Sequence, residues 1–317
     1  VAQRGTSSTT NGYGSVDRFA TSFGGTDEAP TQAQVDLSSS DTPYSSGFRK
    51  AFKLTNGNQT STGTQDYLSL AYSIEAQDIA NSGWNYTDPN SKLTIQFWAK
   101  SSVAKTFILS LYTQDGTDYA YNHKYALAAN TWTKITHTFP GNSNLTFDNN
   151  NGLGIQFQWI MYYGTDWTSG STVDQWVTYN GSTSTPDDTA DWWTANDATF
   201  EITGVQLEVG STSTNFQFKS FAEELALCQR YFVSAIAAIG SQYNGDGGNV
   251  VQGVYVTYPT IIRTTPTITF PTNHSTSNVD NADHTYHVSS TGFSYRVNIS
   301  GNGNFHRQST YNAAAEL

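Results

Sequence analysis

Apolar and polar residues alternate over short segments through most of the chain. Alternation with a period of two, in segments rich in β-branched and aromatic residues, predicts β-strands. Before residue 210, the predicted strands are 48–54, 67–74, 93–99, 106–112, 132–139, 154–163 and 200–209. Loops rich in Gly, Asn, Asp and Ser separate these strands. The pattern therefore predicts an antiparallel β-sandwich of the jelly-roll kind.

One segment has a helical pattern instead. Ser220 lies three residues before Glu223, which is the spacing of a capping box. Phe221, Leu225 and Cys228 then recur at helical spacing, and Phe232 continues the same face. We expect this face to be buried, with Cys228 acting as a small apolar residue rather than as a reactive thiol.

The strand pattern returns after this helix, at 250–258, 267–270, 286–288 and 293–299. The predicted fold class is all-β, with an N-terminal jelly-roll sandwich, a short connecting helix and a smaller C-terminal β-sandwich. The predicted boundaries are 1–219 for the jelly roll, 220–233 for the helix and 234–317 for the C-terminal β domain. No repeat at a fixed period is present, which argues against a β-solenoid.

Composition narrows the function classes. The 317 residues carry a formal net charge of −11, and only 13% of them are charged, whereas 14% are aromatic. An acidic chain without Lys and Arg clusters has no electrostatic attraction to nucleic acid, so we expect no nucleic-acid partner. The longest apolar run, 232–239, is too short to span a bilayer, so we expect no membrane insertion. The start VAQRGTSS lacks Met and the pattern of a signal peptide, so we expect coded residues upstream of Val1.

Candidate catalytic groups are dispersed. His123, His137, His274 and His306 are isolated along the sequence. His284 and His287 lie three apart beside Asp283, and on a strand such residues point to opposite faces. The acids that glycan hydrolysis would need are Asp166, Asp174, Asp187, Asp188, Asp191, Glu201 and Glu208. Because they are typical of solvated loops and no nucleophile or phosphate-binding motif accompanies them, we predict no catalytic residue, no cofactor and no enzyme activity.

A structural calcium ion is a further hypothesis. Calcium takes oxygen ligands, and such ions are common in jelly-roll sandwiches. The candidate ligands are Asp17, Asp27, Glu28 and Glu208. No other metal is expected.

Aromatic residues are concentrated in loops that also contain Asp, Asn, Thr, Ser and Gly. The set comprises Tyr162, Tyr163, Trp167, Trp176, Tyr179, Trp192 and Trp193, together with Trp84 and Tyr86. Aromatic rings stack on the C–H face of sugars, while nearby polar groups bind sugar hydroxyls, so the mixture suits a glycan platform. The same rings also suit a subunit interface or a satellite core beneath a long loop. The sequence leaves these three alternatives open.

Several motifs resemble a known family. They are ITGVQLEVGSTSTNFQFKSFAEELALCQRYF at 202–232, VAQRGTS at 1–7, VDRF at 16–19, LTIQFWAK at 93–100, NTWTK at 130–134, RTTPT at 263–267 and YNAAAEL at 311–317. They resemble tailed-phage virion proteins described as tail-fibre-like or head-fibre-like, with a carbohydrate-binding type of jelly roll. The resemblance implies a homo-oligomer, with a trimer expected, on the virion surface and in contact with other virion proteins.

Two function hypotheses follow. The first is a fibre or fibre-like phage virion protein that recognises host-surface glycans through its aromatic loops. The alternative is a purely structural capsid-decoration or filament-forming protein whose aromatic loops are assembly interfaces. The host, the ligand, the oligomeric state and the part of the virion to which the protein attaches are not encoded in the motifs.

Overall fold

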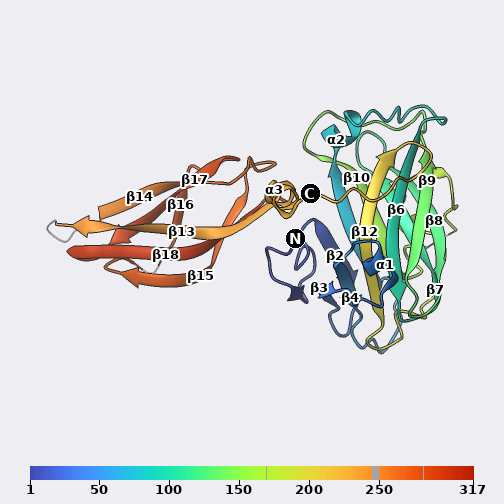
Figure 1. Ribbon diagram of the computed structural model, residues 1–317, viewed down its shortest axis with the longest axis horizontal. Helices are drawn as coiled ribbons and strands as arrows, with labels where there is room; N and C mark the ends of the chain where they lie inside the picture. Colours follow the sequence, from blue (N-terminus) through green and yellow to red (C-terminus); the bar gives the residue numbers. More distant parts are fainter. Residues whose placement is uncertain (169, 245–249, 281) are drawn as a thin grey trace. The chain divides into compact units, whose positions relative to one another are not determined.

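The chain forms two compact units, residues 2–218 and residues 219–316, in the computed structural model (Figure 1). The structure describes residues 1–168, 170–244, 250–280 and 282–317. We call the first unit the N-terminal sandwich and the second the C-terminal unit. Strands form most of the regular structure of both units, so the predicted all-β fold class is confirmed.

One layer of the N-terminal sandwich is an antiparallel sheet of six strands, which we call sheet A. Its strands in spatial order are β1 (Ser7–Ser8), β3 (Thr31–Asp36), β4 (Lys50–Thr55), β12 (Thr199–Val209), β6 (Lys92–Ser101) and β9 (Thr133–Pro140). Strand β12 comes last in the sequence, yet it lies between β4 and β6 in the middle of the sheet. Its Phe200 is opposite Leu54 on one side and Ser101 on the other.

The second layer, sheet B, also has six antiparallel strands. Their order is β11 (Trp176–Thr178), β8 (Tyr119–Leu127), β7 (Lys105–Thr113), β10 (Leu153–Tyr163), β5 (Tyr67–Glu75) and β2 (Phe19–Gly24). In β10, Gln158 pairs with Ser110 of β7 and with Ala71 of β5. The register fixes which side chains share each face of the sheet, because neighbouring residues along a strand point to opposite faces.

The core lies between the two sheets. Phe97 of sheet A and Trp159 of sheet B are both fully buried, and their ring centroids are 5.6 Å apart. Phe157 and Leu109 are buried beside them. Burial of each such side chain contributes about 1.5–3 kcal/mol to stability, so the alternating apolar positions of the strands provide the main stabilisation of the sandwich.

Short helices connect the strands. They are α1 (Thr42–Ser45), α2 (Ala76–Ala80) and the 3-10 turn η1 (Gly181–Thr183). Within the described ranges, no helix of either unit has the length and apolar character needed to cross a membrane. The longest connection is the segment 164–198 between β10 and β12, which contains β11 and η1 and which we call the covering segment.

The C-terminal unit has two three-stranded antiparallel sheets. One is β13 (Phe232–Tyr243), β18 (Gly303–Ala314) and β15 (Thr267–Ser277), and the other is β14 (Val250–Thr257), β17 (Gly292–Ile299) and β16 (His284–Tyr286). Phe293 and Tyr295 of β17 share a buried core with Tyr311 of β18. This shared core confirms the predicted smaller β-sandwich.

Helix α3 (Phe221–Gln229) opens the C-terminal unit. The predicted capping box is present, because Ser220 Oγ accepts the Glu223 N–H and the Glu223 carboxylate accepts the Ser220 N–H. The helix is shorter than the predicted 220–233, since β13 begins at Phe232. Cys228 is buried as expected, but Phe221 is 71% exposed. Only the last turn of the helix reaches the core, so the predicted buried face does not extend to Phe221.

Candidate functional site

Four of the predicted site aromatics lie in the core. Trp192 and Trp193 have no exposed surface, and Trp84 and Tyr162 are 3% and 7% exposed. A ring with less than a tenth of its surface accessible cannot stack on a sugar or on a neighbouring subunit. For these four residues the structure corrects the platform and interface hypotheses in favour of the core.

The two adjacent tryptophans are fixed by the backbone around them. Trp193 Nε1 donates a hydrogen bond to Ser61 O at 2.8 Å, and Trp192 Nε1 donates to Thr199 O at 3.2 Å. The Asn56 amide donates in turn to the carbonyl of Trp193 at 2.7 Å. Buried indole N–H groups need such partners, and here the loop backbone supplies them.

Trp176 and Tyr86 are half-buried and also packed against the sandwich. Trp176 stacks edge-on against Tyr121 at 5.4 Å and donates from Nε1 to Pro140 O at 2.7 Å. Tyr86 packs edge-on against Phe147, with centroids 4.9 Å apart. Both rings pack against the edge of the core, so only part of their surface is exposed to solvent.

The outer side of sheet B carries a different set of side chains. Along β10, Ile155, Phe157 and Trp159 enter the core, so Gln156 and Gln158 project from the opposite side. The register places small and polar residues of β5 and β7 around them. We define the Gln156–Gln158 face as Ser69, Ala71, Ser73, Ser110, Tyr112, Gln156 and Gln158.

A chain of hydrogen bonds runs along this face. Tyr163 OH donates to Gln158 Oε1 at 3.3 Å, and Gln158 Nε2 donates to Gln156 Oε1 at 2.6 Å. Gln156 Nε2 then donates to Ser73 Oγ at 3.1 Å. These bonds use one amide donor of each glutamine and leave one donor and further lone pairs on each amide. The two amides are therefore held in place while they retain capacity to bind a polar ligand.

Aromatic rings border the Gln156–Gln158 face on two sides. On one side Tyr67 packs edge-on against both Tyr163 and Trp167, at 5.9 and 6.0 Å. On the other side Tyr112 packs against Tyr179 at 4.4 Å, and Tyr179 is 36% exposed. Of the nine predicted aromatics, Tyr163, Trp167 and Tyr179 thus lie beside this outer face.

The tyrosines of the face are neutral at physiological pH. Burial, with the hydrogen bond from Tyr112 OH to Asp118 Oδ2 at 2.7 Å, raises the pKa of Tyr112 to about 12. Burial also raises the pKa of Tyr163 to about 12. Both hydroxyls keep their protons, which they donate to Asp118 and to Gln158.

The covering segment lies over the rest of the outer side of sheet B. Ile108 and Ile160 project from this side, yet neither has any exposed surface. The Asn122 amide donates to Ser171 Oγ at 3.1 Å and to Ser184 O at 3.0 Å. The covering segment therefore lies over one half of the outer side of sheet B. On the Gln156–Gln158 face, Gln156, Gln158 and Tyr112 are half-buried, and the small residues between them, Ser69, Ala71, Ser73 and Ser110, are buried.

A buried ion pair holds the covering segment in place. Lys105 of β7 lies 2.9 Å from the Asp188 carboxylate, and both side chains are almost fully buried. Lys105 Nζ also donates to Thr189 O at 2.8 Å. Burial lowers the pKa of Lys105 and raises that of Asp188, which shows that loss of hydration outweighs their mutual attraction. Asp188 therefore has a structural partner rather than a free position in a catalytic pair.

The proposed calcium ligands lie in three separate hydrogen-bond networks. Asp17 accepts from the backbone and side chain of Gln3, at 3.3 and 3.2 Å. Asp27 and Glu28 bind the 58–60 loop through Thr60 N at 2.7 Å and Asn58 N at 2.9 Å. Glu208 accepts from Thr214 N at 2.9 Å. The structure brings Asp27 and Glu28 to one loop and leaves Asp17 and Glu208 with other partners.

Two histidines that are isolated in the sequence meet in the structure. The rings of His123 and His137 stack with centroids 3.6 Å apart, and Asp174 Oδ1 lies 2.7 Å from His123 Nδ1. Burial, with the neighbouring His123, lowers the pKa of His137 to about 4. Asp283, next to His284 in the sequence, does not join this group. Its carboxylate accepts hydrogen bonds from Arg307, Tyr295 and Ser309.

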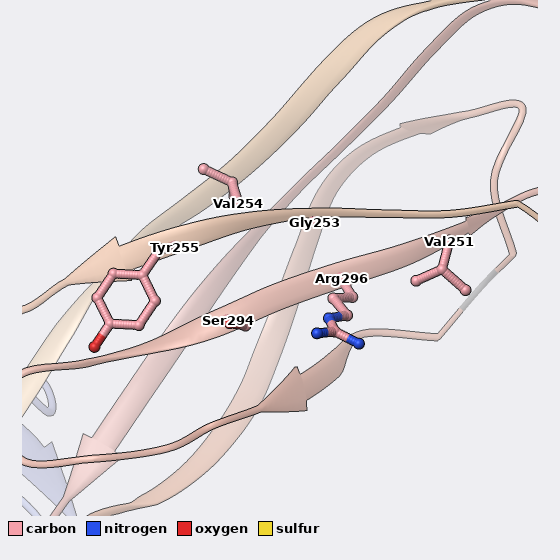
Figure 2. A pocket seen from close by; sticks show the side chains of 6 residues that line it. All are labelled: Val251, Gly253, Val254, Tyr255, Ser294 and Arg296. Carbon is pink, nitrogen blue, oxygen red and sulfur yellow. The ribbon is translucent and has the colours of Figure 1, made fainter.

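The C-terminal unit has a separate pocket of about 370 Å3 on β14 and β17. It is lined by Val251, Gly253, Val254, Tyr255, Ser294 and Arg296. Figure 2 shows Tyr255 and Arg296 on one side of the two strands, with Val254 on the other. The Arg296 guanidinium lies 4.2 Å from the centre of the Tyr286 ring, and Tyr255 is 51% exposed. This second surface is more exposed than the Gln156–Gln158 face, and it contains the positively charged Arg296 side chain.

The sequence pattern did not single out Gln156, Gln158, Tyr112 or Tyr67 as site residues. A signal for the two glutamines is present in the strand segment Gly154–Trp159. There the glutamines alternate along the strand with large apolar residues, so they point to the other face. Glutamine is common on a solvated strand face, so this pattern alone does not separate a binding face from an ordinary one. A binding face can be told from an ordinary strand face only once the strand register is known. The register brings Tyr67, Tyr112 and Tyr179, from three other segments, to the side of the glutamines.

No protein-family model matches the sequence, and no curated protein matches it. Among solved structures, the enzymatically active domain of tailspike protein 4 from bacteriophage CBA120 is 13% identical with a TM-score of 0.33. That match spans 61% of this chain and 19% of the tailspike chain. The N-terminal cellulose-binding domain of Cellulomonas fimi β-1,4-glucanase C is 10% identical with a TM-score of 0.33, over 67% of this chain and 100% of that domain.

A family 11 carbohydrate-binding module from Clostridium thermocellum, solved with a β-1,3-1,4-mixed-linked tetrasaccharide, is 13% identical with a TM-score of 0.31. It matches 66% of this chain and 98% of its own. At such TM-scores the similarity does not decide function. The class that the fold itself defines is an all-β protein of two sandwich units, and its function must be argued from its own side chains.

Proposed function

We propose that the N-terminal sandwich binds glycans and that the Gln156–Gln158 face is the binding surface. The observation that supports this is the hydrogen-bonded row from Tyr163 through both glutamines to Ser73. Its amides are oriented before any ligand arrives, which lowers the entropic cost of binding. Rings beside the row match the C–H faces of sugars, and the amides match their hydroxyls.

The chemistry of the face favours neutral sugars. None of its seven defining residues carries a charge at neutral pH, and its tyrosines stay protonated. The whole chain is acidic, with a net charge of −11, which disfavours a strongly anionic polysaccharide at long range. We therefore expect a hydroxyl-rich, uncharged glycan.

We further propose that the chain is a non-enzymatic phage virion protein, a fibre or fibre-like appendage that recognises glycans of the host surface. The resemblance of residues 202–232 to fibre-like virion proteins supports this location. In such an assembly, a homo-oligomer (a trimer by expectation) held by other virion proteins would present several faces at once. Avidity then multiplies weak single-site affinity by roughly 10² to 10⁴. The function needs no cofactor.

The alternative is a structural capsid-decoration or filament-forming protein. Strand β14 of the C-terminal unit supports it, because Val251 and Tyr255, which project from the same side of the strand, are each 51% exposed. Exposed apolar side chains on one strand are typical of an assembly interface. In that case the sandwich would bind neighbouring subunits rather than sugars.

An array of neutral and acidic bacterial polysaccharides tests the proposal, with the intact chain and the Gln158→Ala variant. We expect saturable binding of neutral glycans and a roughly tenfold loss of affinity in the variant, which is the effect of one or two lost hydrogen bonds. Gln34→Ala is the matched control, because Gln34 is half-buried on β3 of sheet A. It should bind like the parent protein.

Tyr255→Ala separates the two surfaces of the protein. Retained binding in this variant supports the Gln156–Gln158 face, whereas loss of binding there with full binding by Gln158→Ala would move the site to the C-terminal pocket. Absence of binding to every glycan, together with a change of oligomeric state in Tyr255→Ala on sedimentation, would favour the structural alternative.

A further inference from the structure

Two strands from different sheets meet at one edge of the N-terminal sandwich, and each contributes a histidine. His137 belongs to β9, the edge strand of sheet A, and His123 belongs to β8, which neighbours the edge strand β11 of sheet B. On β8, His123 lies two residues from Tyr121 and from Tyr125, which both face the core, so its ring is on their side of the strand and points toward sheet A. The two imidazoles therefore stack across the gap between the sheets, at 3.6 Å.

An aspartate completes the group from a third segment. Asp174 Oδ1 lies 2.7 Å from His123 Nδ1 and 3.8 Å from His137 Nε2. One ligand atom from each of the three residues lies within 4.8 Å of the others. Asp174 has a left-handed backbone with φ of 59°, and its N–H donates to Asn122 O at 2.8 Å. The carboxylate is thus held in place by the backbone of sheet B.

One atom of this group lacks the partner that burial normally demands. His137 Nε2 is buried and accepts or donates no hydrogen bond among the described residues. Buried polar atoms are usually satisfied by a protein group, a water molecule or an ion, and His137 Nε2 lies 3.8 Å from the Asp174 carboxylate. Asp174 is 53% exposed at its side chain, so the group can be reached from solvent.

We propose that His123, His137 and Asp174 form a zinc-binding site. Two imidazole nitrogens and one carboxylate oxygen are borderline ligands that suit Zn2+, whereas Ca2+ requires oxygen ligands alone. Tetrahedral zinc places its ligand atoms about 3.4 Å apart. His123 Nδ1 and Asp174 Oδ1, now 2.7 Å apart, would therefore separate by about 0.7 Å, and Asp174 Oδ1 and His137 Nε2, now 3.8 Å apart, would approach by about 0.4 Å. Rotation of the side chains would supply these shifts and turn both imidazoles toward the ion. Water would occupy the fourth position.

Zinc at this site would cross-link the two sheets. His137 is fixed in sheet A by the β6–β9 ladder, and His123 is fixed in sheet B by the β7–β8 ladder. A bond from each to one ion therefore joins the layers at an edge where no strand connects them directly. The site is independent of the proposed glycan face.

The test uses the intact chain without a histidine tag, freed of metal by EDTA and dialysis. Calorimetric titration with Zn2+ should give one site per chain. Tryptophan fluorescence should show unfolding of the sandwich about 5–10 °C higher at a zinc concentration a hundred times the Kd. Co2+ should give the visible absorption of a four-coordinate site. Absence of saturable binding below millimolar metal would overturn the proposal.

His123→Ala and Asp174→Ala test the assignment. Each should lower zinc affinity by more than about 100-fold, since loss of a ligand exceeds loss of a supporting partner. Each should keep the metal-free circular dichroism of the parent, because both side chains are partly exposed. His306→Ala is the matched control at an exposed histidine of the C-terminal unit. Unchanged zinc binding in His123→Ala, or equal loss in His306→Ala, would show that the ion binds elsewhere.

Discussion

The two sides of strand β10 differ completely although they alternate along one segment. The inner side places Phe157 and Trp159 in a core with no exposed surface beyond 2%. The outer side places Gln156 and Gln158 in a row of hydrogen bonds that still has free donors. The same backbone therefore supplies the stability of the sandwich on one side and its candidate chemistry on the other.

The outer side is itself divided. Where the covering segment lies on it, Ile108 and Ile160 are as buried as core residues. Where the segment ends, glutamines, serines and tyrosines replace the isoleucines. The candidate binding face is thus limited to the part of the outer side that the covering segment does not reach, and three changes probe that boundary.

The largest effect should come from an inner tryptophan. Trp193→Ala removes a fully buried ring with a satisfied N–H, and we expect a loss of about 3–5 kcal/mol in the free energy of unfolding. All eight tryptophans lie between residues 84 and 193, so fluorescence during urea unfolding reports the N-terminal sandwich alone. Trp167→Ala, at the half-buried ring beside Tyr67, should cost only about 1 kcal/mol. Equal losses of unfolding free energy in Trp193→Ala and Trp167→Ala would contradict the distinction between the buried core and the outer side of sheet B.

A smaller effect should follow from releasing the covering segment. Asp188→Ala leaves the Lys105 ammonium buried without its carboxylate and should cost roughly 3 kcal/mol by the same urea measurement. The double variant Lys105→Met with Asp188→Ala should recover part of this loss, because no buried charge remains. If the double variant is as unstable as Asp188→Ala, the pair holds the segment by contacts other than charge.

The smallest effect should be a pH dependence from the outer face. A tyrosine in an unfolded chain ionises near pH 10, whereas the pKa of Tyr163 in the fold is about 12. Between these values the unfolded chain loses a proton that the folded chain keeps, so stability falls as pH rises. Tyr163→Phe should make this fall shallower, by up to about 1.4 kcal/mol per pH unit, in urea unfolding at pH 10 and 11.

Tyr255→Phe is the matched control for this pH dependence. The hydroxyls of Ser289 and Thr291 lower the pKa of Tyr255, so its removal should not make the fall shallower. An identical slope in the Tyr163→Phe and parent proteins would mean that water reaches the Tyr163 hydroxyl freely.

The fold was largely predictable because burial in a sandwich follows local alternation. The segments 93–99 and 106–112 lie within β6 and β7, and the capping box at Ser220 begins α3 as expected. Strand β8 was missed, since Tyr119 and Tyr121 alternate with small and polar residues that are also typical of a loop. The end of α3 was misplaced because Phe232 suits a helix face and a strand equally well.

The site was less predictable because loop residues are buried or exposed by tertiary position. Trp192 and Trp193 stand among Asp, Thr and Ala, a pattern that suits a surface, yet the path of the covering segment carries both inward. His123 and His137 are isolated in the sequence and meet only because β8 and β9 face each other from separate sheets. No local pattern encodes that meeting.

The central place of β12 in sheet A also bears on how the protein is made. Strands β4 and β6 each pair with β12, so both keep one unpaired edge until residues 199–209 leave the ribosome. At roughly 5–20 residues per second, that wait after β6 is roughly 5 to 20 s. During this time the half-made sheet exposes two edges that other nascent chains can join. Completion of the sandwich is therefore a late step in synthesis, and its yield should depend on how quickly β12 arrives.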